Sequence, residues 1–356
     1  MLSNEIVKFA AGNTDFFVAF QDYYNHVNKM GAYDESVSLS EKSEKINSAF
    51  FAEVEKRSGV TRSAENAESW AANPMVQWAA FAVIDAVVNS VLPQTLNPTM
   101  GMFTDLRFTS YGDIVKFKVK PRSLFVVSNG AHGERTSFRQ KKFDGDYMMA
   151  PVEHIVTVYT DMYRVLAGKE DLASFIRLVV LSVETRMGKD AADALATGLS
   201  TGSYPSQLSI SGAFDVQQFI TLGETVEAYN YGARPVILGT ATALAKVLPD
   251  SSLGYRMNAD ANGGSIELIK NFYGYDLIRM PQYATGSNFG LALDPNALYF
   301  VSPSMDKLVK GVVSNSLTNS NQFYDNADIT QNFTYRKDWD FAFLSAAWGA
   351  KYEITD

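Results

Sequence analysis

The feature that most constrains this chain is a long, extended and basic segment between residues 105 and 163. Apolar residues alternate with lysines over Lys116–Lys120, and alternation returns over Val152–Tyr163, as in strands with one apolar and one polar face. Residues 131–150 are polar and basic, so we expect a long two-stranded hairpin with a basic tip. An isolated hairpin cannot bury its own faces. It needs a partner surface, and another copy of the chain is the simplest source of one.

Charge is distributed unevenly along the sequence. The 356 residues include 31 Lys and Arg and 39 Asp and Glu, a net charge of −8, which argues against a dedicated nucleic-acid binder. Residues 101–150 nevertheless hold nine basic and five acidic side chains, whereas residues 1–100 hold seven and twelve. Such a basic insert contacts acid in another subunit, acid in its own chain or nucleic acid, or it is a solvated hairpin. The composition leaves all four interpretations open.

The clearest helix of the sequence is expected over Lys169–Leu199. Its apolar residues recur every three or four positions from Phe175 to Leu195, which is typical of a helix with one buried face. At a rise of 1.5 Å per residue, a helix of about 28 residues is about 42 Å long. We expect it to end at Gly198, where a loop rich in Gly, Ser and Pro begins.

Three further helices are expected before the basic segment, over residues 1–33, 40–57 and 75–92. Pro74 fits the start of the third helix, and Pro93 is expected to end it. That helix is as apolar as a membrane span, but a central Asp85 would cost a few kcal/mol in lipid. We therefore interpret it as a buried helix of a soluble protein, and the N-terminus shows no pattern of a targeting signal.

Residues 214–315 alternate between short strands and helices, as a compact α/β block does. A helix is expected over Val216–Tyr229 and strands over Pro235–Gly239 and Ala297–Val301. Met305–Val313 fits either a helix or a strand. The tail, Asn332–Ile354, alternates again and is expected to supply closing strands.

Few residues of the sequence support an active site. The chain has no Cys and three His, which excludes thiolate metal sites and a Cys nucleophile. Gly198–Gly202 fits the G-x-S-x-G pattern, but a helix precedes Ser200 and every His lies upstream, contrary to the nucleophile elbow. Glu153 and His154 are neighbours on an expected strand and therefore point to opposite faces. We expect no catalytic residue, no cofactor and no metal.

The order of these elements resembles the major capsid protein of tailed bacteriophages, which has the HK-ninety-seven-like fold. Asp105–Tyr163 resembles the E-loop, and Lys169–Thr197 resembles the spine helix. Phe214–Ser314, with the segments PVILGTATALAKV and NALYFVSPSMDKLV, resembles the A-domain. Asn332–Ile354 resembles the strand segment that closes the P-domain. The resemblance covers roughly residues 65–356 and implies an α+β phage major capsid fold with an N-arm, an E-loop β-hairpin, a long spine helix, a P-domain and an A-domain.

The resemblance also implies a division of the chain. The expected parts are residues 1–64 as an N-terminal helical arm or scaffold-like segment, 65–104 as the first part of the P-domain, 105–163 as the E-loop hairpin, 164–213 as the P-domain with the spine helix, 214–314 as the A-domain and 315–356 as the closing strands of the P-domain. Some family members cleave an N-terminal scaffold-like domain on maturation. Residues 1–64 fit either such a domain or a long N-arm.

The function that the resemblance implies is assembly, not catalysis. Copies of the chain are expected to form hexamers and pentamers of an icosahedral virion shell around double-stranded DNA, in the host cytoplasm. Scaffolding, portal and decoration proteins are the further partners that the resemblance implies; the DNA is enclosed without sequence-specific binding and no membrane takes part. The E-loop residues expected to contact a neighbour are Lys116, Lys118, Lys120, Arg122, Arg135, Arg139, Lys141 and Lys142. The alternatives are an encapsulin-type nanocompartment shell and an α/β enzyme or binding module.

Overall fold

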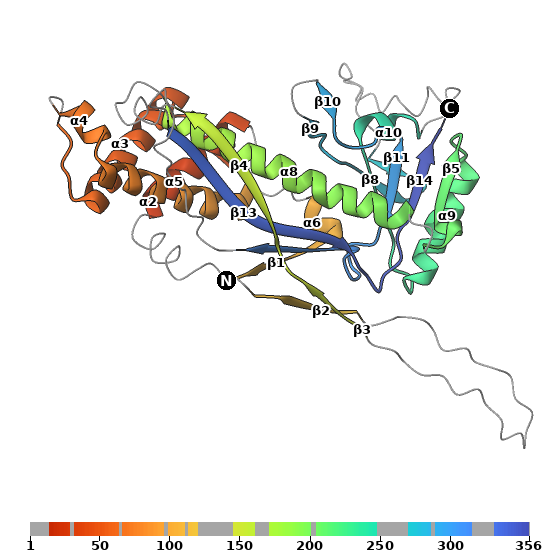
Figure 1. The fold of residues 1–356 in the computed structure, drawn as a ribbon. Helices are drawn as coiled ribbons and strands as arrows, with labels where there is room; N and C mark the ends of the chain where they lie inside the picture. Colours follow the sequence, from red (N-terminus) through yellow and green to blue (C-terminus); the bar gives the residue numbers. More distant parts are fainter. Residues whose placement is uncertain are drawn as a thin grey trace, which may run out of the picture.

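The structure is a computed structural model, and it describes residues 14–28, 32–63, 66–95, 99–110, 113–119, 145–160, 171–200, 204–247, 270–285, 289–314 and 331–355. Helices gather at one end of the molecule and a sheet at the other, and one long helix runs between them (Figure 1). Among the described helices, none has both the length and the apolar character that crossing a membrane requires.

Four helices of the described residues form the helical end, which we call the helical lobe: α2 (Thr14–Asn28), α3 (Leu39–Ser58), α4 (Ala67–Ala71) and α5 (Pro74–Thr95). Helix α3 begins one residue earlier than expected because the hydroxyl of Ser38 accepts a hydrogen bond from the Glu41 amide and caps the helix. Helix α5 starts at Pro74 as expected, but it continues two residues past Pro93. The expectation that Pro93 ends the helix was therefore wrong. Burial of the apolar side chains of α5 outweighs one missing N–H donor.

A four-stranded sheet runs beside the long helix. Its order is β1 (Thr104–Thr109), β12 (Val309–Ser314), β13 (Gln331–Phe343) and β4 (Val152–Thr160). Strand β1 is parallel to β12, and the other pairs are antiparallel. We had expected β1 and β4 to belong to the hairpin of residues 105–163, but both lie in this sheet. Within the ambiguous segment 305–313, the residues from Val309 onward form strand β12, and all six residues of β12 are buried.

The long helix, α8 (Leu172–Ser200, 29 residues), links the two ends of the molecule. Its first half, including Ile176 and Val180, packs into the core of the helical lobe. Its second half, including Leu195 and Leu199, packs with α6 (Met100–Phe103) and the sheets at the other end. The expected helix over residues 169–199 is confirmed over its described part. It connects the two ends of the molecule because its side chains belong to the hydrophobic core of each end.

The other end is built on a six-stranded sheet. Its order is β5 (Ser209–Gly212), β14 (Ala350–Ile354), β11 (Ala297–Val301), β6 (Val236–Gly239), β8 (Tyr275–Arg279) and β7 (Asn271–Phe272). Helices α9 (Val216–Tyr229) and α10 (Ala241–Ala245) contribute to its core, next to the short helix η1 (Ser206–Leu208). A separate small ribbon pairs β9 (Ala284–Thr285) with β10 (Gly290–Leu291).

The α+β class and the order of elements expected for the phage capsid fold are confirmed. Sheet membership differs from the expected domain boundaries in two places. Strand β12, expected in the A-domain, pairs with β13 of the closing segment. Strand β14, expected in the P-domain, pairs with β11 and β5 in the six-stranded sheet. The chain therefore crosses between the two ends more often than the linear division implies.

Candidate assembly surfaces

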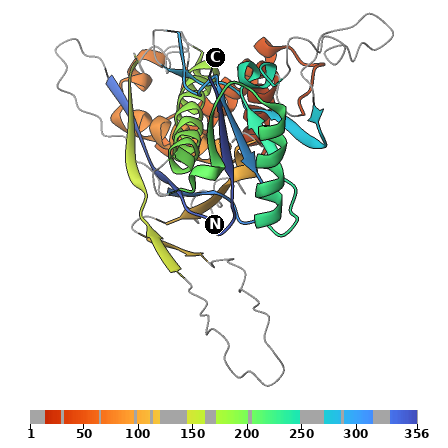
Figure 2. The ribbon, with the colours of Figure 1, turned by 90° about the vertical axis from the view of Figure 1, so that its right-hand side faces the viewer.

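A small hairpin projects from the body of the molecule. Strand β2 (Val115–Val119) pairs in antiparallel register with β3 (Gly145–Met149). Both views show this pair leaving the lower edge of the body (Figures 1 and 2). Among the described residues, the two-stranded part of the expected excursion is thus limited to this pair. Its position makes it the first candidate surface for contact with another molecule.

The inner face of the hairpin is anchored on its own sheet. Phe117 and Met149 are buried against Val312 of β12. The guanidinium carbon of Arg107 lies 4.3 Å from the centre of the Phe117 ring, a cation–π contact. Arg107 also donates a hydrogen bond of 3.3 Å from Nη1 to the carbonyl oxygen of Lys116. The base of the hairpin is therefore held by the body, and its direction is set by the fold.

The outer face of the hairpin is basic and apolar. Lys116 and Lys118 are exposed there, and Lys116 Nζ lies 2.7 Å from Asp146 Oδ2. Met148, the register partner of Lys116, is exposed on the same face. Lys116 and Lys118 are the two expected contact residues that the structure describes. The other six lie outside the described residues: Lys120, Arg122, Arg135, Arg139, Lys141 and Lys142.

Exposed apolar side chains lie on the hairpin and along the free edge of the four-stranded sheet. They are Ile114 before β2, Tyr147 and Met148 on β3, and Val152 and Ile155 on β4. Strand β4 pairs with β13 on one side only, so it is an edge strand of its sheet. Sequence reasoning selected the basic residues of this region and missed the apolar ones, although the alternating pattern had indicated an apolar face.

Carboxylates gather on the outer face of the same sheet. Glu153 of β4 and Asp338 of β13 are register partners, and Asp340 follows on the same side of β13. Burial raises the pKa of Asp338 above its usual value, and the negative charge of Glu153 adds to this shift. Burial also raises the pKa of Asp340. We call these three residues the acidic ladder. Like charges opposite each other are unfavourable, and Arg336 of β13 offsets the charge of Glu153, with its Nη1 3.1 Å from Glu153 Oε1.

Two residues that the sequence singled out have packing roles. The ring of His154 stacks on Trp339, with 3.8 Å between ring centres, and its Nε2 lies 3.7 Å from Asp190 Oδ2. Ser200 is the last residue of α8, and its hydroxyl donates a hydrogen bond to the carbonyl of Ala196. Neither is arranged as a nucleophile or as a metal ligand. Within the described ranges, no group of His, Asp and Glu is placed to hold a metal ion.

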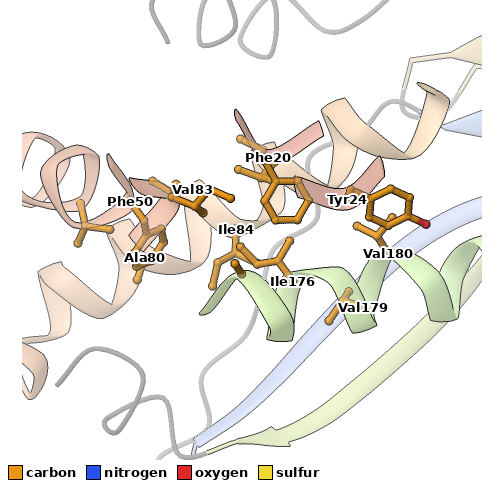
Figure 3. Packing of buried hydrophobic residues seen from close by; sticks show 14 of the residues in the cluster. Phe20, Tyr24, Phe50, Ala80, Val83, Ile84, Ile176, Val179 and Val180 are labelled. Carbon is orange, nitrogen blue, oxygen red and sulfur yellow. The ribbon is translucent and has the colours of Figure 1, made fainter. Parts of the chain in front are cut away.

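The helical lobe is joined to the spine helix by packing and by hydrogen bonds. Phe20 and Phe50 of the lobe and Ile176 of α8 are buried in one cluster (Figure 3). The Tyr24 hydroxyl donates a hydrogen bond of 2.6 Å to Glu184 Oε2 on α8. Arg177 Nη2 donates one of 2.8 Å to the Asn28 side-chain oxygen. Helices α2 and α3 therefore share a core with α8.

A protein-family model matches almost the entire chain. The family is described as "SPbeta prophage-derived putative capsid protein YonB", and the match covers residues 20–347. The chain belongs to this capsid protein family. The expected tailed-phage major capsid protein is thereby confirmed, and the virion is where this capsid protein resides. No curated protein sequence matches it.

Solved structures of shell proteins are among those to which this capsid protein is similar. The mature capsid of bacteriophage PhiM1 matches with a TM-score of 0.48 at 9% identity, over 73% of this chain and 88% of that chain. The capsid of a native GTA particle matches with 0.47 at 11% identity, over 74% and 92%. The SrpI encapsulin complex from Synechococcus elongatus matches with 0.42 at 14% identity, over 74% and 89%. The family assignment rests on the family model and not on these likenesses.

Proposed function

We propose that copies of this capsid protein assemble into hexamers and pentamers of an icosahedral shell that encloses double-stranded DNA. The observation that carries this proposal is the match of the capsid family over residues 20–347. The projecting β2–β3 hairpin supports it, because a hairpin whose outer face is uncovered needs a partner surface. In this proposal the chain is structural and catalyses no reaction.

The proposed contact joins the hairpin of one subunit to the acidic ladder of its neighbour. Lys116 and Lys118 are exposed cations on a projecting strand, and the register partners Glu153 and Asp338 are exposed and half-buried carboxylates of the sheet. Their charges are complementary, which orients an encounter and fixes its register. The basic residues Lys120, Arg122, Arg135, Arg139, Lys141 and Lys142 extend the same contact in this proposal.

The helical lobe stays in the shell subunit in this proposal. Removal of α2 and α3 would expose the apolar faces of α5 and α8, which are buried against Phe20 and Phe50. The expected alternative for residues 1–64, a scaffold-like segment that is cleaved, is disfavoured for residues 14–58 by this shared core. The expected domain division is otherwise kept as a proposal with two changes. Strand β12 is assigned to the P-domain with β13, and strand β14 is assigned to the A-domain with β11.

The remaining partners follow from a shell that assembles in the host cytoplasm. Scaffolding, portal and decoration proteins are proposed to contact the shell. DNA is enclosed without sequence-specific binding. The net charge of −8 on each subunit repels the DNA phosphates and so limits adsorption of the DNA to the shell.

Assembly is tested by electron microscopy and light scattering of the purified protein across a salt series, with and without a co-expressed scaffold. Closed shells, pentamers or hexamers are the expected result. A 39.3 kDa monomer under every condition, scaffold included, refutes the proposal. Shells that fill with a protein cargo and exclude DNA during expression identify the encapsulin-type alternative instead.

The hairpin contact is tested by charge exchange. Lys118→Glu is expected to prevent assembly, because it brings a carboxylate against the acidic ladder. Asp338→Lys in the same chain is expected to restore assembly, because the opposite signs meet again. Lys45→Glu, at an exposed position of α3, is the matched control and should assemble normally. Failure of Asp338→Lys to rescue Lys118→Glu contradicts the proposed pairing.

A further inference from the structure

The base of the β2–β3 hairpin meets the body in a small apolar cluster. Phe117 of β2 and Met149 of β3 are buried there against Val312 of β12. Apolar contact has no preferred direction, so this cluster holds the hairpin without by itself fixing the angle at which its strands leave the body. Contacts whose energy depends on geometry, such as hydrogen bonds and cation–π contacts, are needed to fix that angle.

Arg107 of β1 supplies both kinds of contact to β2. Its guanidinium carbon lies over the Phe117 ring, 4.3 Å from the ring centre. Its Nη1 donates the hydrogen bond of 3.3 Å to the main-chain carbonyl of Lys116. The first contact orients a buried ring of the hairpin, and the second orients the backbone of the strand that carries it.

The guanidinium of Arg107 is in turn held by Asp105. Its Nη2 lies 3.3 Å from Asp105 Oδ2, two residues earlier on the same strand and therefore on the same face. Lys310, the register partner of Asp105 on β12, is buried. Its Nζ lies 3.8 Å from the same carboxylate oxygen and forms an ion pair with Asp306. Because a buried charge that loses its partners is strongly unfavourable, Lys310 keeps Asp105 in place, and Asp105 keeps Arg107 in place.

Arginine suits this position because its guanidinium is planar and presents its donors in a rigid fork. One Nη group of Arg107 contacts the hairpin and the other contacts Asp105, so a single rigid group connects β2 to the four-stranded sheet. The side chain is 46% exposed. Its loss should therefore leave the buried core intact and act on the direction of the hairpin.

We propose that Arg107 is a positioning residue for assembly, because it sets the direction in which the β2–β3 hairpin leaves the body. This inference rests on the proposed shell assembly, in which the hairpin contacts a neighbouring subunit. A hairpin that samples many directions has the binding direction only in a fraction of the subunits, and the apparent affinity falls by that fraction. Arg107 raises this fraction from within its own subunit.

The direction of the hairpin can be measured with two spin labels on unassembled subunits. The chain has no cysteine, so Met148→Cys on β3 and Leu178→Cys on α8, both at exposed positions, introduce two unique thiols. Double electron–electron resonance should give a narrow distance distribution when Arg107 is present and a broad one in Arg107→Gln. Arg107→Lys should lie between them, because one ammonium cannot reproduce the fork.

Arg62→Gln is the matched control for these distances. It removes the same charge and another cation–π contact, since the guanidinium carbon of Arg62 lies 4.0 Å from the centre of the Phe51 ring in the helical lobe. The label distances should stay narrow in this variant. A distribution in Arg107→Gln as narrow as in the wild type overturns the inference, and so does an equal broadening in Arg62→Gln.

Assembly of the unlabelled protein is the second measurement. Arg107→Gln should melt close to the wild type, but the protein concentration at which shells form should rise by about threefold or more, as loss of an exposed cation–π contact implies. Arg62→Gln should assemble at the wild-type concentration. Assembly of Arg107→Gln at that same concentration overturns the inference alone. A wild type that forms no oligomer overturns the proposed function, whereas the spin-label distances come from single subunits and do not depend on it.

Discussion

Replacement of Phe50 by Ala tests whether the helical lobe and the spine are one folding unit. Phe50 lies on α3, is 0% exposed, and packs in the cluster that includes Val83 of α5 and Ile176 of α8. Truncation of a buried Phe to Ala removes its transfer free energy and leaves a cavity, at a cost of about 3–5 kcal/mol. Because domains are stable by only about 5–15 kcal/mol, this loss is large.

Urea unfolding of Phe50→Ala, followed by circular dichroism and by tryptophan fluorescence, measures this loss. We expect the transition that reports on α8 to shift to lower urea by the full amount, in step for both probes. Val18→Ala, on the lobe but 63% exposed, is the matched control and should change the free energy of unfolding by less than about 0.5 kcal/mol. An early transition of the lobe alone, with the main transition unmoved, would refute the shared core and would reopen cleavage of residues 14–58.

Three further changes have expected outcomes. Burial raises the pKa of Glu184 above 4.5, so its carboxyl stabilises the fold when protonated at low pH and this contribution is lost as the pH rises through the raised value. Glu184→Gln, which still accepts the hydrogen bond from Tyr24, should therefore melt higher than the wild type at pH 7 and equally at pH 4 in a thermal scan. Gly198→Ala should destabilise by about 1–3 kcal/mol in urea despite the better helix propensity of Ala, because its Cβ would overlap the Phe343 ring. Asn230→Ala should cost about 2 kcal/mol in the same assay, because the buried amide holds two main-chain groups that would lose their partners.

Elements with strong local signals were predictable from the sequence. Helix α9 was expected over residues 216–229 and occupies those residues. Its start is specified locally, since Asp215 caps it by accepting a hydrogen bond from the Gln217 amide. Helix α8 and strand β11 were predicted for the same kind of reason: a clear apolar pattern with turn residues on either side.

Strand pairing was not predictable because the partners are far apart in the chain. Strand β1 pairs with β12 some 200 residues later, and β4 pairs with β13 rather than across the hairpin. Nothing local distinguishes these partners from others. Residues 305–313 were ambiguous for a related reason: β12 is buried on both faces, so its pattern does not alternate. Gly311 reflects this burial, since a Cβ there would meet Phe341 and Leu106.

The candidate surfaces were predictable only in part. Lys116 and Lys118 were proposed from charge and alternation, which the sequence displays directly. The acidic ladder depends on the register of Glu153 against Asp338, which only the fold reveals.

The direction of the hairpin is coupled to the spine helix through β4. Strand β4 of the body begins three residues after β3 of the projecting hairpin ends. The chain therefore runs almost without interruption from β3 into β4. Along β4, His154 stacks on Trp339, whose indole Nε1 donates a hydrogen bond of 3.0 Å to Asp190 of α8. A neighbour that binds the hairpin therefore exerts force on β4, which is fixed to α8 through His154, Trp339 and Asp190. In the proposed shell, this connection between β4 and α8 sets the angle between neighbouring subunits. Trp339→Phe removes the hydrogen bond to Asp190. It should broaden the distribution of shell diameters seen by electron microscopy and leave the hairpin contact intact.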